Sequence, residues 1–408
     1  MIQKQGGTAP LLDHHVAGTE PDQELIARAA SLVPLLRKNA EKGSEQRFVP
    51  QPVMRAIEEA GLFSLLVPRR LGGQAANMRT TMEALAELAR GDGSTAWAAT
   101  VLNICGWFAS TFGEQAQNDV RADGEAARVC GVLMPGERCE RVDGGYRISG
   151  RWPYASGSFD AQWATVGILV DSPPGANPLA LALVPASAWT IEPTWFVTGM
   201  EGSGSDTLVV EDHFVPDHRV QRVEPMLEGN FATPFQVAEQ SSNMAFSATG
   251  SLILVAAQLG LARHAKERTL EKLPSKIVAY TMHGPAKNSP MHQLRIAEAV
   301  TKLDMAELLM QRAARDIDAA ALDGSTLDQL HRGRIRSDTG TIAELVTTSI
   351  DQLLSATGAG SFAKANVLSR IWRDSAIAAR HALVVPDIGK ELYGQLLLGA
   401  DGPMAPVL

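Results

Sequence analysis

The chain has little cysteine, no excess of positive charge and no apolar run of about 18 residues that could span a bilayer. Its three cysteines, Cys105, Cys130 and Cys139, follow no disulfide spacing, and no C-x-x-C or H-x-x-x-H pattern suggests a metal. The net charge of -8 argues against a nucleic-acid or anionic-membrane surface, because both need basic patches. The start, residues 1–7, lacks the apolar core of a signal peptide. We therefore expect a cytoplasmic protein without a metal.

What is present fits an ordinary globular chain of 408 residues, 45% hydrophobic and 20% charged. Residues 1–22 are predicted to form a flexible leader. Residues 23–127 repeat apolar side chains every three or four positions, which predicts a helical domain. Residues 128–225 change to short runs of period two, with Asp143-Gly144-Gly145 as a hairpin turn, which predicts a β-domain. Residues 226–408 return to helical spacing.

Four long helices are expected in this last part: Met244 to Leu273, Met291 to Leu322, Ile335 to Thr357, and Asn366 to His381. The predicted fold is therefore α+β and mainly α. It consists of an N-terminal helical domain, a small β-barrel or β-sandwich, and a C-terminal four-helix bundle.

The C-terminal run Ser369 to His381 places a histidine and several charges on one predicted helix. Spacings of three and four residues put Arg370, Asp374, Ile377 and His381 on one face. Such a face suits a site that holds an anionic cofactor and handles a proton near neutral pH, where histidine titrates. The alternative is a helix with surface salt bridges and a histidine that only packs.

A glycine-rich segment, Gly358 to Ala363, breaks the apolar segment before this helix, so the backbone can approach a ligand closely. It also matches G-x-G-x-x-A. A dinucleotide fingerprint must follow a strand, however, and the preceding residues have helical spacing, so we exclude a Rossmann domain.

The order of the three parts resembles the acyl-CoA dehydrogenase fold over nearly the whole chain. Local signatures look like one branch of it, the two-component (group D) flavin-dependent monooxygenases. The residues that carry the resemblance are Gly61-Leu62-Phe63, Val67 to Gly73, Gly93-Ser94-Thr95-Ala96-Trp97, Asp143 to Gly157, Gly202-Ser203-Gly204-Ser205, Trp372-Arg373-Asp374 and His381.

The resemblance implies an oxygenase component that receives reduced flavin, FMNH2 or FADH2, from a separate NAD(P)H flavin reductase. With O2 as cosubstrate it would form a C4a-hydroperoxide and hydroxylate an aromatic or heteroaromatic molecule, such as an indole- or polyketide-like metabolite. The same chemistry could oxidise the nitrogen of an amine or amino sugar. Two further alternatives stay open, an acyl-CoA dehydrogenase and a non-catalytic scaffold.

Site residues follow from the resemblance position by position. It implies that Ser156 lies beside the flavin N5 edge with Ser158 close by, and that His381 approaches the peroxide and the substrate, which makes these three the catalytic candidates. The remaining candidates for holding the flavin are Trp152, Tyr154, Gly157, Arg370 and Asp374, together with Arg268, Gln293, Thr357, Gly358 and Gly360, which would reach the cofactor tail of a neighbouring subunit. The serines could instead cap their own backbone in a strand-end turn.

The substrate candidates are Trp97, Asn103, Cys105 and Trp107. Phenol-hydroxylating relatives often carry a histidine in this stretch, and its absence puts a simple phenol substrate in doubt. The stretch after Asp374 likewise lacks the glutamate context of acyl-CoA dehydrogenases and offers only Glu391. We also expect a homotetramer assembled through the helical bundle, because its Ala- and Leu-rich helices carry more apolar surface than one core needs.

Overall fold

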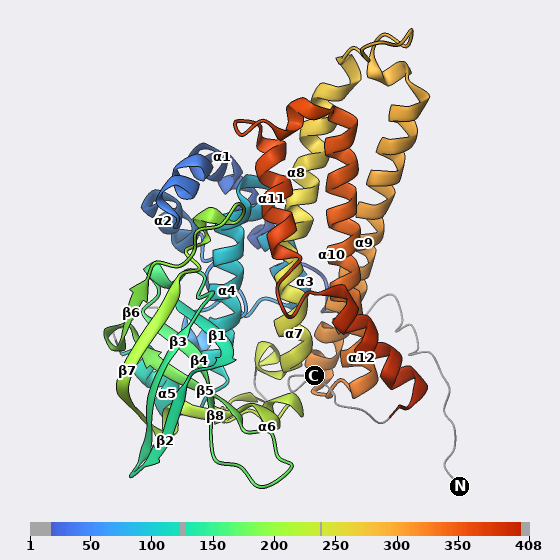
Figure 1. Ribbon diagram of the computed structural model, residues 1–408. Helices are drawn as coiled ribbons and strands as arrows, with labels where there is room; N and C mark the ends of the chain where they lie inside the picture. Colours follow the sequence, from blue (N-terminus) through green and yellow to red (C-terminus); the bar gives the residue numbers. More distant parts are fainter. Residues whose placement is uncertain (1–17, 123–126, 237–238, 401–408) are drawn as a thin grey trace, which may run out of the picture.

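The computed structural model describes residues 18–122, 127–236 and 239–400. The predicted leader therefore lies outside the described residues, except for residues 18–22. As Figure 1 shows, helices of the N-terminal region, a β-region and a long helical bundle follow one another along the chain. The prediction of a mainly helical α+β fold is confirmed.

The N-terminal region is helical. Its helices are α1 (Gln23–Gln46), α2 (Gln51–Glu59), α3 (Met78–Gly91), α4 (Gly93–Ser110) and α5 (Glu114–Val120). Side chains of Asp22, Asn77 and Asp92 cap α1, α3 and α4 by accepting hydrogen bonds from backbone N–H groups of the first turn. Helix α4 is buried along its whole length, so it lies at the centre of the molecule.

The middle region consists of short strands in two sheets. The strands are β1 (Val129–Pro135), β2 (Arg138–Val142), β3 (Gly145–Trp152), β4 (Trp163–Leu169), β5 (Leu179–Pro185), β6 (Trp189–Glu192), β7 (Thr207–Pro216) and β8 (Val220–Arg222). One sheet has the order β1-β4-β5-β8 and the other β2-β3-β7-β6. The described strands form no closed barrel, so of the two predicted forms the two-sheet arrangement is the one found. Val142 pairs with Gly145 across the predicted hairpin turn.

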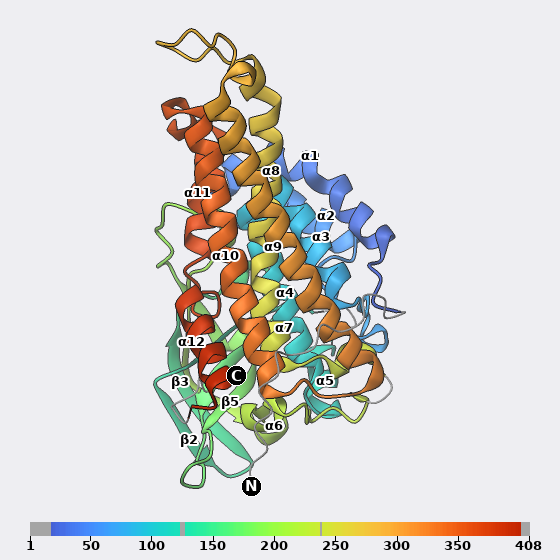
Figure 2. The ribbon, with the colours of Figure 1, turned by 90° about the vertical axis from the view of Figure 1, so that its right-hand side faces the viewer.

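The C-terminal region is a bundle of long helices, which Figure 2 shows side by side. After α6 (Val223–Leu227) come α7 (Phe246–Leu252), α8 (Ala256–Lys272), α9 (Pro290–Asp323), α10 (Gln329–Thr357), α11 (Val367–Ala378) and α12 (Pro386–Leu398). The four predicted helices correspond to α7–α8, α9, α10 and α11. Helix α10 begins six residues earlier than expected, and α12 was not predicted as a separate helix.

One continuous apolar core joins the three regions. Helix α8 lies against α3 so closely that a Cβ added at Gly260 would meet the carbonyl oxygen of Ala86. The stretch Phe246–Ser275 is long and apolar enough to cross a membrane, contrary to the expectation that no such run exists. In its most apolar window, 89% is buried inside the protein, as expected for a core helix.

Candidate active site

His381 lies three residues beyond the end of α11, in the turn that leads to α12. The prediction that one helix carries Arg370, Asp374 and His381 on a common face is therefore wrong for the histidine. Pro386 begins α12, and proline disfavours helical backbone at the residue before it, so the chain must leave one helix before it starts the next. The His381 carbonyl accepts the N–H groups of Val384 and Val385 and closes the turn.

The imidazole of His381 is held on two sides. Its ring meets the Trp97 ring at 60°, with centroids 5.7 Å apart. Its Nδ1 accepts the backbone N–H of Leu383 at 3.1 Å. Because an accepting nitrogen carries no hydrogen, the neutral ring has its hydrogen on Nε2.

Burial, and then the positive charge of Arg336, lower the pKa of His381 to about 4. The expectation that this histidine titrates near neutral pH is therefore wrong for the structure. At pH 7 it is an uncharged ring that can donate a hydrogen bond through Nε2.

Ser156 lies in the turn that follows β3. Tyr154 and Gly157 both have positive φ, 67° and 76°. Only glycine fits easily at 157, because a Cβ there would also meet Leu102 at 3.0 Å. The Ser156 hydroxyl oxygen accepts the indole N–H of Trp97 at 3.1 Å, so Trp97 touches both Ser156 and His381.

A row of three hydroxyls fixes the direction of the Ser156 hydrogen bond. Ser203 donates to the Met200 carbonyl at 2.8 Å, so it can only accept from Ser205, 2.7 Å away. Ser205 has then used its hydrogen and accepts from Ser156 at 2.6 Å. Ser156 is therefore left with acceptor capacity and no free hydrogen. The sequence singled out Ser203 and Ser205 only as part of a signature and gave them no role.

The other residues of this turn differ in exposure. The Ser158 hydroxyl is buried and donates to the Gly204 carbonyl at 3.3 Å. Tyr154 is 66% exposed, with its ring edge-on to Trp195, so one side is open to a ligand. Trp152 is buried in the β-region and donates its indole N–H to Gly167, which gives it a structural role there.

Two fully buried carboxylates join α11 to the other regions. Asp374 accepts the N–H of Met200 at 2.6 Å, and Asp92 caps α4 by accepting from Thr95. Burial first, and the negative charge of Asp92 second, raise the pKa of Asp374 to about 7, while Arg370 acts in the opposite direction. Asp374 thus connects α11 to the loop that carries Ser203 and Ser205, so its contacts here are structural.

The predicted phosphate residues gather at the other end of α11. A cavity of about 270 Å³ is lined by Arg268, Lys272, Lys276, Thr357, Gly360, Ser361, Asn366 and Leu368, among others. Lys276 donates to the Thr357 carbonyl, and Gly358 lies beside its amino group. Of the residues predicted to reach a cofactor tail, Gln293 is not in this lining and instead donates to the Lys287 carbonyl.

Of the four predicted substrate residues, only Trp97 joins His381 and Ser156. Asn103 is fully buried and bonds Leu62, Ala99 and Leu65, and Trp107 donates to the Ser241 carbonyl. Cys105 is buried, and burial raises the pKa of its thiol to about 12. Packing alone explains these three residues. Because α4 is buried on all sides, its apolar spacing could not show which face borders a site.

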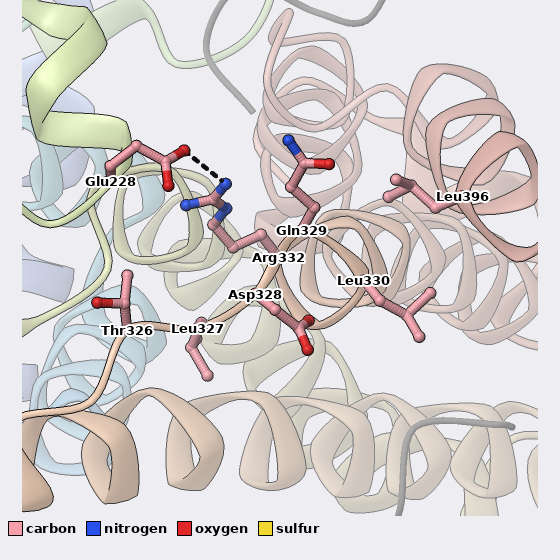
Figure 3. Close-up of a pocket in the computed structure, with 8 residues that line it drawn as sticks. All are labelled: Glu228, Thr326, Leu327, Asp328, Gln329, Leu330, Arg332 and Leu396. Carbon is pink, nitrogen blue, oxygen red and sulfur yellow. Dashed lines mark hydrogen bonds and ion pairs between the residues drawn. The ribbon is translucent and has the colours of Figure 1, made fainter. Parts of the chain in front are cut away.

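An apolar cavity of about 190 Å³ lies beside the turn that carries His381. Its lining includes Phe108, Leu133, Phe246, Gly250, Arg336, Ala382 and Leu383. The sequence reading missed all of these. A larger, open cavity of about 550 Å³, shown in Figure 3, lies between the α9–α10 loop and α12 and contains the Arg332–Glu228 ion pair. It includes none of the predicted site residues, so we do not assign the chemistry there.

Within the described ranges, no group of three or more histidine, cysteine or acidic side chains could hold a metal ion.

Comparison with known proteins identifies both helical regions. Residues 22–120 match the model of the acyl-CoA dehydrogenase N-terminal domain and residues 252–386 that of the C-terminal domain. The chain is 32% identical over 399 residues to the oxygenase component of an FADH(2)-dependent resorcinol hydroxylase from Rhizobium sp. strain MTP-10005, with 94% of this chain and 96% of the relative covered.

Two solved structures are similar over nearly their whole length. The 3-HSA hydroxylase from Rhodococcus sp. RHA1 has a TM-score of 0.88 and 29% identity, with 94% of this chain and 99% of that one covered. XiaF from Streptomyces sp., solved with FADH2 and glycerol, has a TM-score of 0.87 and 32% identity, with 94% and 97% covered. This chain therefore belongs to the oxygenase components of the flavin-dependent monooxygenases, which have the acyl-CoA dehydrogenase fold.

Proposed function

We propose that this protein takes reduced flavin from a separate reductase and uses O2 to hydroxylate an aromatic small molecule. The observation that carries the proposal is the junction of Trp97, Ser156 and His381 beside an apolar cavity. Three parts of the chain meet there: α4, the turn after β3 and the turn after α11.

The residues at the junction fit the ring of a reduced flavin. The N5 position of reduced flavin carries a hydrogen, and Ser156 offers an oxygen that can accept it, because its own hydrogen points to Ser205. The open side of Tyr154 provides an aromatic surface. The cationic cavity at the other end of α11 supplies Arg268, Lys272 and Lys276 for phosphate.

Bound reduced flavin supplies the two electrons that cleave O2, one oxygen atom going to the aromatic product and the other to water. The chain's own residues control access and protons. Buried side chains around Trp97 and His381 exclude water. His381 presents a neutral Nε2–H that can donate to oxygen or to the substrate over the whole range near neutral pH.

The lining of the apolar cavity favours an aromatic or heteroaromatic substrate. The ring centroids of Phe108 and Phe246 lie 4.8 Å apart at its wall with the rings tilted by 37°, and Leu133 adds to the apolar surface. Relatives are named for resorcinol, p-hydroxyphenylacetate and indole-3-acetate. Glu391, the acid that an acyl-CoA dehydrogenase would need in this stretch, is exposed on α12, which favours hydroxylation over α-proton abstraction.

We also propose a homotetramer. Met291, Leu294, Met305 and Leu308 are 49–66% exposed on α9 at helical spacing, which forms an apolar stripe suited to a second copy. In such an assembly the cationic cavity of one subunit would receive the phosphate of a neighbour's flavin. Light scattering at micromolar concentration tests it, and a monomer would contradict it.

The function is tested in two steps. Anaerobic titration should show that reduced FMN or FAD binds more tightly than the oxidised form. The reduced complex is then mixed with ¹⁸O2 and a panel of phenols, indoles and polycyclic aromatics, and products are analysed by mass spectrometry. Incorporation of one ¹⁸O atom supports the proposal. Tight binding of oxidised flavin that is bleached by acyl-CoA would support a dehydrogenase instead. Absence of flavin binding would support a scaffold.

A further inference from the structure

Helix α10 carries three buried arginines at every second position, Arg332, Arg334 and Arg336, which are 2%, 6% and 7% exposed. Two of them have carboxylate partners. Arg334 pairs with Asp316 and lies 3.7 Å from Asp338, and Arg332 pairs with Glu228 at 3.2 Å.

Arg336 has no carboxylate partner in the described part of the chain. It donates to the carbonyl of Ala382 at 2.8 Å and to the carbonyl of Leu383. Burial lowers the pKa of Arg336 to about 10, with no acid to offset the effect. A buried, unpaired guanidinium is costly for folding, so its presence calls for a function that a neutral side chain could not serve.

The two carbonyls belong to the residues that directly follow His381. Leu383 is bound at both ends of its backbone: its carbonyl accepts from Arg336, and its N–H donates to Nδ1 of His381. The planar guanidinium binds both carbonyls with donors held in a fixed geometry, whereas a lysine would offer rotating donors on a flexible chain. A shift of Arg336 would therefore shift the peptide that holds the imidazole.

Close contacts between α10 and α12 fix the backbone at Arg336. A Cβ added at Gly389 would lie 2.6 Å from the Arg336 carbonyl oxygen, and one added at Gly340 would lie 2.6 Å from Pro386. Helices α10 and α12 are thus in direct backbone contact, which fixes the start of α12 just beyond the His381 turn.

The charges around the imidazole point to the same residue. Helix α4 presents the uncharged ring of Trp97, and α10 presents Arg336. The neighbouring Arg380 is exposed and donates to the Ala376 carbonyl of α11. Among the described groups, Arg336 is the charge that acts on His381.

We propose that Arg336 is a positioning residue for the hydroxylation: it holds the Ala382–Leu383 peptide so that His381 stays a neutral Nε2–H donor in one orientation. The inference rests on the proposed function of His381. It assigns a role to a residue that lines the apolar cavity and is connected to His381 through the backbone of Ala382 and Leu383.

The test compares three variants. Arg336→Met removes the charge and both hydrogen bonds to the carbonyls. Arg336→Lys keeps the charge but loses the planar arrangement of donors. Arg332→Met is the matched control, because it removes another buried arginine of α10, one turn away, that lines the same cavity but binds the Leu227 carbonyl and Glu228 instead of the His381 turn. Exchange of each histidine's C2 proton, followed by mass spectrometry against pH in flavin-free protein, reports the titration of His381 without any activity.

Arg336→Met should move the titration midpoint of His381 to higher pH and lower the product formed per O2 by about tenfold to 10²-fold, because a misplacement of 1 Å can cost about 10²-fold. Binding of reduced flavin should change little. Arg336→Lys should keep the low midpoint and recover part of the coupling. Arg332→Met should lose thermal stability, while the pH midpoint of the His381 titration should not change.

Three results would overturn the proposal. One is an unchanged His381 midpoint in Arg336→Met, and another is an equal shift in Arg332→Met, which would mean general loosening. The third is full coupling in Arg336→Lys, which also decides the matter if the methionine variant does not fold. A wild-type protein that makes no product would refute the proposed function instead, and the exchange measurement would still report on Arg336.

Discussion

The two ends of α11 have opposite surroundings, although only about 18 Å of helix separates them, at about 1.5 Å per residue over 12 residues. Beyond its C-terminal end, His381 meets the ring of Trp97 beside an apolar cavity, and Arg336 is the charge that acts on it. At its N-terminal end, Arg268, Lys272 and Lys276 line a cationic cavity. Chemistry with O2 needs a dry enclosure, whereas a phosphate needs cations. The difference indicates that a flavin's ring and its tail are held by different means.

The largest effect is expected beyond the C-terminal end of α11, where His381 lies. His381→Ala should lower hydroxylation by roughly 10²-fold or more, the scale of losing an acid–base group, with O2 consumption diverted to hydrogen peroxide. Folding and reduced-flavin binding should be largely retained, and His283→Ala, at an exposed histidine, serves as control.

The pH profile sharpens this prediction. Because the pKa of His381 is lowered to about 4, the ring stays neutral from pH 6 to 8 and coupling should be flat there. Product yield that follows a titration near pH 6.5, or full coupling in His381→Ala, would show that the histidine does not act as described.

At the cationic end the effect should fall on binding. Arg268→Ala should weaken reduced-flavin affinity by about tenfold, as expected for one charged hydrogen bond, and coupling at saturating flavin should be unchanged. Arg28→Ala, at an exposed arginine paired with Glu24, should have no effect. If an anaerobic titration gives Arg268→Ala and Arg28→Ala the same affinity for reduced flavin, the cavity does not bind the flavin.

A smaller effect is expected from the serine row. Ser205→Ala frees the Ser156 hydrogen, so Ser156 no longer acts only as an acceptor, and the preference for reduced over oxidised flavin should fall by about threefold to tenfold. Ser205→Thr keeps the hydroxyl and should keep the preference. Equal ratios of the two dissociation constants in wild type and Ser205→Ala would contradict the hydrogen-bond direction.

The smallest effect concerns Asp374, between the two ends. Its pKa is raised to about 7 in the folded protein from an ordinary 3.8, so the folded state binds a proton that the unfolded state has lost. This contribution therefore destabilises the fold as pH rises from about 4 to 7. Asp374→Asn keeps an oxygen for the Met200 N–H and should raise Tm at pH 8 by roughly 2 °C, but not at pH 4.

Asp351→Asn, at an exposed position of α10, should change Tm little at either pH. A gain for Asp374→Asn that is equal at both pH values would refute the titration.

The order of the three regions could be read from the sequence because hydrophobic spacing changes from helical to alternating and back. Glycine and serine signatures also placed Ser156 and Gly360 correctly outside the long helices, whereas Thr357, predicted in the same turn as Gly360, is the last residue of α10. Arg336 could not be found in this way, because its partners, the carbonyls of Ala382 and Leu383, are backbone groups 46 and 47 residues away. Three arginines at every second position, Arg332, Arg334 and Arg336, were the one signal available.

The position of His381 was predicted only in part. Its chain neighbours suggested a helix, but Pro386 and the contacts with α10 end that helix early. Its burial also comes from distant residues, so its lowered pKa could not be read from the local sequence. The residues on α4 show the same limit, since spacing alone could not separate Trp97 from Asn103 and Trp107.

The most direct measurement uses mixed oligomers, because the two ends of α11 are proposed to serve different flavins. His381→Ala and Arg268→Glu subunits with different tags are coexpressed, and oligomers carrying both tags are assayed at a flavin concentration where each parent is inactive. If the cavity serves a neighbour's flavin, one intact site forms in each mixed pair, and activity should return to about a quarter to a half of wild type. Activity no higher than that of the two parents would show that both ends serve the same flavin and would contradict this account.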